Sequence, residues 1–127
     1  MAALLDGLRV LVLEDEFLIA MDVEQLCRDN GAADVTIARD LAEIDLGGPL
    51  VFDVAIVDLM LDGVSTLGFA AHLRERGIPF VFASGYSNLE ELAVGFPGVP
   101  FVQKPYSSTD LVEAVAAASR RLPAAEA

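Results

Sequence analysis

Short apolar runs alternate with helix-length segments along this chain, and this alternation limits its possible folds most. The runs are rich in branched residues, and the segments between them carry apolar residues at helical spacing. The expected strands cover residues 8–13, 34–38, 53–57, 79–83 and 101–103. Parallel strands need connections of this length, so the sequence predicts an α/β fold with a doubly wound five-stranded parallel sheet and helices on both faces.

Glycines mark the ends of several expected helices. The helical patterns cover residues 17–30, 40–45, 66–76, 88–94 and 109–122. Gly31 and Gly77 follow the first and third patterns directly, as C-terminal glycines commonly do. Ser107 is a candidate N-cap for the last helix. Gly95 and Pro97 predict a short fourth helix.

The length and composition predict one globular domain spanning residues 1–127. A chain of 127 residues is close to the ~150 residues of a typical domain, and we expect a core over residues 8–122 with a tail at 123–127. Hydrophobic residues make up 54% of the chain and charged residues 22%. A single cysteine, Cys27, excludes an internal disulfide and a zinc site with several cysteines.

Acidic residues outnumber basic ones by 20 to 8, for a formal net charge of −12. This charge argues against nucleic acid and anionic membranes as partners, since phosphate binding needs clustered Lys and Arg. It suits divalent cations and basic partners. No apolar run approaches the ~20 residues of a membrane span, and no basic residue precedes an apolar leader. We therefore expect a cytoplasmic protein.

Polar residues follow four of the expected strands. Glu14 and Asp15 follow the first, Asp58 the third, Ser84 the fourth and Lys104 the fifth. Each alone is most simply a turn, cap or surface residue, but four strand ends are hard to explain by capping. Ligands bind at the carboxyl ends of parallel strands, so we expect these side chains to converge.

Crowded carboxylates repel each other, and a divalent cation removes that repulsion. Oxygens from Asp15, Asp58 and a backbone carbonyl suit Mg²⁺. No histidine or cysteine stands at a ligand position, and His72 is predicted to lie on a helix surface. With Lys104 and a hydroxyl nearby, such a site could hold a phosphoryl group, and one Asp could accept it.

These residues stand in motifs that resemble a response-regulator receiver domain over essentially the whole chain. The motifs are VLEDE at residues 12–16, Val57 with Asp58, the hydroxyl of Ser84, and KPY at residues 104–106. The resemblance implies a flavodoxin-like sheet of strand order 2-1-3-4-5. It also implies that Asp58 accepts a phosphoryl group from a sensor histidine kinase or phosphotransfer protein.

The resemblance further implies roles for the surrounding residues. Mg²⁺ would be held by Asp15, Asp58 and the carbonyl of Met60, with Glu14 acting through water.

Other residues would follow the phosphoryl group. Ser84 and Lys104 would contact it, and Phe101 would change rotamer together with Ser84 as a switch. Met60 and Tyr86 would flank the path of the hydrolytic water and tune the lifetime of the phosphorylated state.

Two stretches depart from the usual receiver pattern. Asp62, followed by Gly63, replaces the usual proline four residues after the acceptor, which predicts an atypical loop over residues 63–67. FASGY at residues 82–86, together with KPY, is similar to the "FAT GUY" subgroup of single-domain receivers.

The sequence favours a stand-alone phosphoacceptor that acts through a downstream protein or drains phosphate from a kinase. We expect it to be a monomer or a weak homodimer. We also expect no enzymatic activity other than its own phosphorylation from a phosphodonor and its own dephosphorylation. One alternative is a Mg²⁺-dependent phosphohydrolase with an aspartyl nucleophile, although such enzymes use a second acid where Met60 stands. Another is an interaction module that works without phosphorylation.

Overall fold

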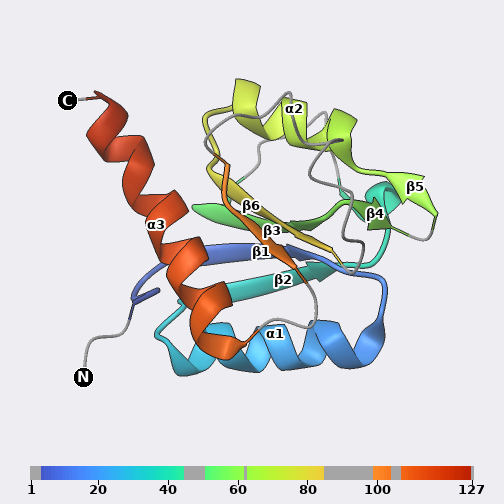
Figure 1. Cartoon of the computed structure of the whole chain (residues 1–127), viewed down its shortest axis with the longest axis horizontal. Helices are drawn as coiled ribbons and strands as arrows, with labels where there is room; N and C mark the ends of the chain where they lie inside the picture. The colour runs from blue at the N-terminus through green and yellow to red at the C-terminus, as the bar shows by residue number, and fades with distance from the viewer. Residues whose placement is uncertain (1–3, 45–50, 62, 85–98, 104–106, 127) are drawn as a thin grey trace.

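A five-stranded parallel sheet forms the centre of the computed structural model (Figure 1). The structure describes residues 4–44, 51–61, 63–84, 99–103 and 107–126, and only the backbone of Ser84, Gln103 and residues 120–126. The strands are β1 (Arg9–Leu13), β2 (Asp34–Ala38), β3 (Val54–Asp58), β6 (Phe80–Ser84) and β7 (Phe101–Gln103). Their order is β2-β1-β3-β6-β7. Counted among themselves in chain order this is 2-1-3-4-5, so the predicted sheet is confirmed.

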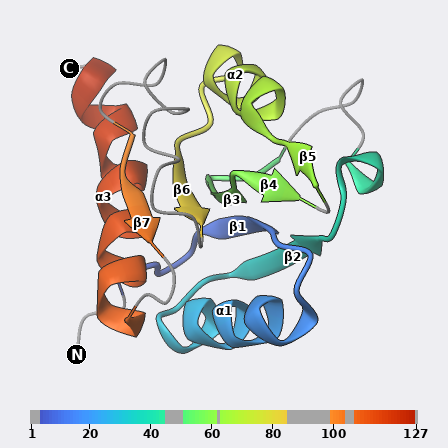
Figure 2. The same cartoon turned by 45° about the vertical axis from the view of Figure 1, so that its right-hand side comes forward.

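Helices cover both faces of the sheet. They are α1 (Phe17–Asp29), α2 (Leu67–Glu75) and α3 (Ser108–Glu126), with a 3-10 turn η1 (Leu41–Glu43) after β2. Figure 2 shows α1 and α3 on one face and α2 on the other. The pattern at residues 88–94 lies outside the described residues.

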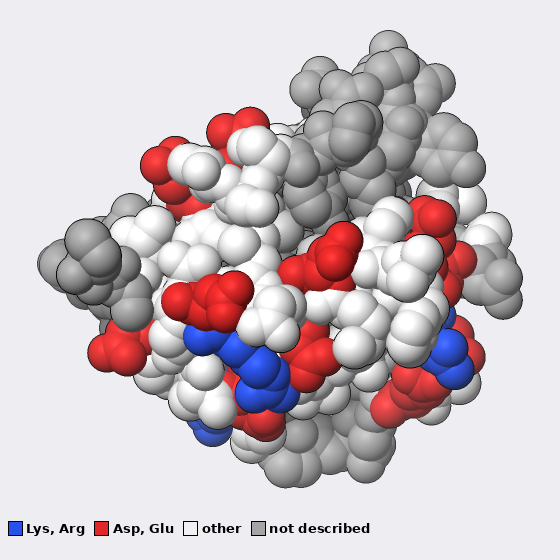
Figure 3. All heavy atoms as spheres, turned by 90° about the horizontal axis from the view of Figure 1, so that it is seen from below, with Lys and Arg blue, Asp and Glu red and all other residues white. Residues whose placement is uncertain are grey.

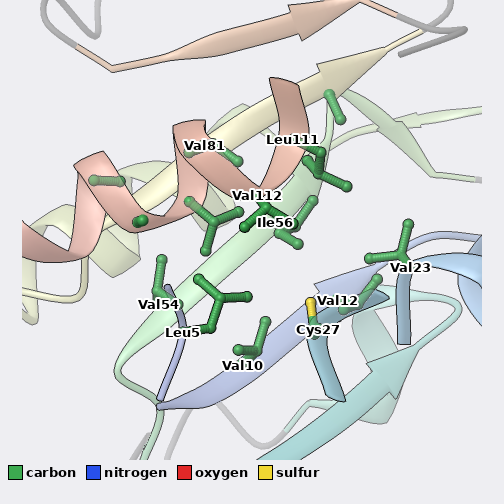
Figure 4. Close-up of a cluster of buried hydrophobic side chains, with 14 of the residues drawn as sticks. Leu5, Val10, Val12, Val23, Cys27, Val54, Ile56, Val81, Leu111 and Val112 are labelled. Atoms are coloured by element: carbon green, nitrogen blue, oxygen red, sulfur yellow. The ribbon is translucent and has the colours of Figure 1, made fainter. Parts of the chain in front are cut away.

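A hydrophobic core lies on each face of the sheet, one on the side of α1 and α3 and one on the side of α2. Strand β1 contributes side chains to both cores, which explains its continuous apolar sequence. Val10 and Val12 point toward α1 and α3, where they pack with Cys27 and Leu111 (Figure 4). Leu11 and Leu13 belong to the second core, on the α2 side.

The helix ends follow the sequence signals closely. Gly31 and Gly77 have φ angles of 96° and 74°, values that favour glycine. The Ser107 hydroxyl accepts a hydrogen bond from the Asp110 amide at 3.0 Å, as an N-cap does. Helix α3 continues to Glu126, four residues beyond the predicted helix end at residue 122. Pro123 lacks only one backbone hydrogen-bond donor, and the alanines that follow it, Ala124 and Ala125, favour helix.

A small antiparallel hairpin replaces the loop predicted over residues 63–67. Its strands are β4 (Met60–Leu61) and β5 (Val64–Ser65), with Met60 opposite Ser65. Gly63 in the turn has a φ of 79°. The Asp-Gly pair at residues 62 and 63 is typical of hairpin turns and could have revealed this element.

His72 lies mid-helix in α2, as predicted, but it is half-buried and not on the open surface. Its Nε2 atom is buried and has no hydrogen-bond partner among the described residues. None of the helices that the structure describes is long and apolar enough to cross a bilayer.

Candidate functional site

Three carboxylates meet at the carboxyl edge of the sheet. Glu14 and Asp15 follow β1, Asp58 ends β3, and the two strands pair in register with Leu13 opposite Val57. One oxygen from each carboxylate lies within 4.8 Å of the others. Glu14 is only 3% exposed and Asp58 7%, whereas Asp15 is exposed. The predicted convergence of these three residues is confirmed.

Glu14 is held by backbone on both sides of its strand end. Its amide donates to the Ala38 carbonyl at 3.1 Å, which extends the pairing of β1 with β2. Its Oε2 accepts from the Glu16 amide at 3.1 Å, at the N-terminus of α1. An unpaired helix amide favours a negative charge, so this contact helps to fix a buried carboxylate.

Asp58 is held through its carboxylate and through its backbone. Its Oδ1 accepts from the Met60 amide at 3.3 Å. Its carbonyl accepts from the Thr66 hydroxyl at 2.6 Å, and Thr66 is fully buried. Thr66 has no predicted role, because a threonine at the start of an expected helix suggests only an N-cap, and no sequence pattern indicates a hydrogen-bond partner eight residues away.

The carboxylate group fits a hard divalent cation. Two of the three carboxylates are removed from water, and placing such charges together is costly unless a cation compensates them. Oxygen ligands of this kind are those that Mg²⁺ prefers. The arrangement could therefore hold a divalent metal ion.

The other predicted site residues are described to different extents. Ser84 closes β6 one residue after Ala83, the register partner of Asp58, so its backbone lies at the same edge of the sheet. Phe101 begins β7 opposite Phe82 and is half-buried. Met60 is half-buried in β4. Lys104 and Tyr86 lie outside the described residues.

Sequence comparison finds response regulators among the curated proteins. The chain is 32% identical over 119 residues to the sensory transduction protein RegX3 of Mycobacterium tuberculosis, covering 88% of this chain and 51% of RegX3. It is 31% identical over 119 residues to the transcriptional regulatory protein PdtaR of the same species, covering 89% and 57%. The chain thus spans about half the length of these relatives. A scan against protein-family profiles finds no match.

Structure comparison finds the same fold in isolated receiver domains. The receiver domain of Francisella response regulator 1452 superposes with a TM-score of 0.76 at 26% identity, covering 91% of this chain and 98% of that one.

Proposed function

Because this chain belongs to the response-regulator receiver domains, the signalling modules of two-component systems, we propose that Asp58 accepts a phosphoryl group from a phosphohistidine donor. The observation that supports this most is the placement of Asp58. Its carboxylate ends the central strand, is almost buried, and lies beside Glu14 and Asp15.

The reaction is a displacement at phosphorus. A carboxylate oxygen of Asp58 attacks the phosphorus, the bond from phosphorus to the donor's imidazole nitrogen breaks, and its electron pair returns to that nitrogen. The product is an acyl phosphate. The Met60 amide at 3.3 Å restricts rotation of the Asp58 carboxylate, which reduces the entropy lost on reaching the line of attack.

Mg²⁺ is the cofactor that we propose for this transfer. Asp15, Asp58 and the Met60 carbonyl would hold it, with Glu14 acting through water. Bound there, it would neutralise the carboxylates and the phosphoryl oxygens. Lys104 and Ser84 would contact the phosphoryl oxygens from the neighbouring strand ends.

Incubation with acetyl phosphate and Mg²⁺, followed by intact-mass measurement, tests the proposal. The chain should gain one phosphoryl mass, and Asp58→Asn should gain none. Asp53→Asn is the matched control, since Asp53 lies next to the opposite end of the same strand. Equal labelling of wild type and Asp58→Asn would move the acceptor to another residue.

We propose the first turns of α1 as the docking surface for the donor protein. Phe17, Leu18 and Met21 are 59%, 76% and 44% exposed, and they directly follow the acidic segment at residues 14–16. Spacings of three and four residues place Met21 beside Leu18 and Phe17 on one helix face. Figure 3 views the molecule from the α1 side, where acidic and basic side chains are interspersed with uncharged ones.

A charge placed in this surface separates docking from chemistry. Leu18→Asp should slow transfer from a phosphotransfer protein that labels the wild type by at least about fivefold, since a desolvated interface anchor is worth over ~1 kcal/mol. Labelling by acetyl phosphate should not change, because that donor needs no docking surface. Equal loss with both donors would argue against a docking role.

The output of phosphorylation is proposed to pass through protein contacts or through removal of phosphate from the kinase. A phosphorylated aspartate adds roughly −1.5 to −2 charges at the sheet edge, which can bias neighbouring segments toward a second arrangement. If this chain acts as a phosphate sink, adding the wild-type chain to a kinase and that kinase's cognate regulator would lower phosphorylation of the regulator. Asp58→Asn should have no such effect.

A further inference from the structure

Thr66 directs its hydroxyl away from the helix that it begins. It is the N-cap of α2, yet its side chain makes no capping hydrogen bond. The hydroxyl donates instead to the Asp58 carbonyl at 2.6 Å. The neighbouring Ser65 hydroxyl accepts from the Leu67 amide at 3.3 Å, so another residue supports the start of the helix. An N-cap hydrogen bond normally stabilises a helix, and here Thr66 makes a contact with the acceptor strand in its place.

Thr66 also fixes the next peptide group. Its amide donates to the Leu59 carbonyl at 3.0 Å, so Thr66 binds two consecutive carbonyls where the chain leaves the sheet. The peptide group between Asp58 and Leu59 is held at its other side by the Leu59 amide, which donates to the Ala83 carbonyl at 3.3 Å. The first peptide plane after the acceptor is therefore fixed at both ends.

The second peptide plane carries the amide that contacts the acceptor carboxylate. Its carbonyl, on Leu59, accepts from Thr66, and its amide, on Met60, donates to Asp58 Oδ1 at 3.3 Å. A peptide group is planar, so holding its carbonyl sets the direction of its N–H. Thr66 and the side chain of Asp58 are thus connected through one rigid group.

We propose that Thr66 is a positioning residue for phosphoryl transfer to Asp58, an inference that rests on the proposed function. Its hydroxyl and amide hold both peptide planes after the acceptor, and the Met60 amide then keeps the carboxylate in one orientation. An in-line attack is sensitive to such placement, because a shift of ~1 Å in a reacting group can cost about a hundredfold in rate.

Three substitutions separate positioning from stability. Thr66→Val keeps the shape and removes the donor, Thr66→Ser keeps the hydroxyl, and Ser65→Ala removes only the contact to the α2 amide. At saturating acetyl phosphate and Mg²⁺, Thr66→Val should be labelled about tenfold more slowly than wild type, whereas Thr66→Ser should stay within about twofold. Ser65→Ala should be labelled at the wild-type rate. All rates are measured at a temperature where thermal melts show each variant fully folded.

Hydrogen exchange supplies a readout that needs no phosphorylation. The Leu59 amide should exchange faster in Thr66→Val than in wild type or Thr66→Ser, because the peptide plane between Asp58 and Leu59 has lost the hydrogen bond that the Thr66 hydroxyl donates to its carbonyl.

The outcomes distinguish the two proposals. A wild type that acetyl phosphate does not label overturns the proposed function, and the inference with it. A labelled wild type with Thr66→Val labelled at the same rate overturns the inference alone. So does equal slowing in Thr66→Ser and Thr66→Val, because the hydroxyl would then have no role.

Discussion

Arg9 and Asp53 form a two-point ion pair at the amino end of the sheet. Arg9 Nε lies 3.0 Å from Asp53 Oδ2, and Nη2 donates to Oδ1 at 3.1 Å. The Arg9 amide also donates to Oδ2 at 2.8 Å, and the Asp53 amide donates to the Arg9 carbonyl at 2.8 Å. These contacts join the beginnings of β1 and β3, on the opposite side from the three carboxylates.

The pair predicts a loss of stability in acid. The hydrogen bond from the Arg9 side chain lowers the pKa of Asp53 below its ordinary value of 3.8. The folded state therefore favours the charged form, and this stabilisation is complete above 3.8 and disappears as the pH falls through the lowered pKa. Asp53→Asn should melt slightly lower than wild type at pH 7, and the difference should close toward pH 2. A constant difference across thermal melts from pH 7 to pH 2 would contradict this role.

Mg²⁺ should raise the melting temperature of the wild type. Relief of repulsion among Glu14, Asp15 and Asp58 stabilises the folded chain, and at ten times the dissociation constant the gain is about 1.4 kcal/mol. For a domain of this size that is roughly 3–6 °C. Asp15→Asn should lose most of the response, whereas Asp53→Asn should keep it. A wild-type melt that millimolar Mg²⁺ leaves unchanged would count against the metal site.

Cys27 should be unreactive until the protein unfolds. Burial raises the pKa of its thiol from 9.0 to about 11. This shift alone lowers the thiolate fraction at pH 8 by about a hundredfold relative to the unfolded chain, and the thiolate is the reactive form. Reaction of the Cys27 thiol with a chromogenic thiol reagent, followed by absorbance, should be slow in buffer and fast in denaturant. Rapid modification of the folded chain would show that the core around α1 opens readily.

The phosphorylated state should decay slowly. The resemblance to receivers implies that Met60 and Tyr86 would flank the path of the attacking water, and neither side chain is an acid or amide that would orient it. Met60→Asn combined with Tyr86→Glu should speed the decay of labelled protein with Mg²⁺ present, since positioning a water contributes several kcal/mol. If the double variant and the wild type decay alike after the donor is removed, these residues do not set the lifetime.

The sequence predicted the sheet and the three carboxylates for one physical reason. Buried parallel strands have continuous apolar sequences that are easily recognised, and their carboxyl ends necessarily meet at one edge. The proximity of Glu14, Asp15 and Asp58 could therefore be predicted without knowledge of any contact.

The hairpin and the role of Thr66 escaped prediction for different reasons. Two-residue strands such as β4 and β5 are too short to show a period of two. Threonine is a common N-cap residue, and only the fold shows that the Thr66 hydroxyl donates a hydrogen bond to the Asp58 carbonyl. The roles of Lys104, Tyr86 and the FAT GUY pattern stay predictions, since residues 85–98 and 104–106 lie outside the described part of the chain.

The parallel sheet places the Arg9–Asp53 pair and the three carboxylates at opposite poles. A five-residue strand such as β1 spans about 16 Å, which exceeds the ~7–10 Å beyond which substitutions usually act additively. Changes at the amino pole should therefore alter the melting temperature without altering phosphorylation chemistry. The domain can accumulate thermostabilising substitutions there while its signalling kinetics stay constant, which makes the two properties separately adjustable in engineering and in evolution.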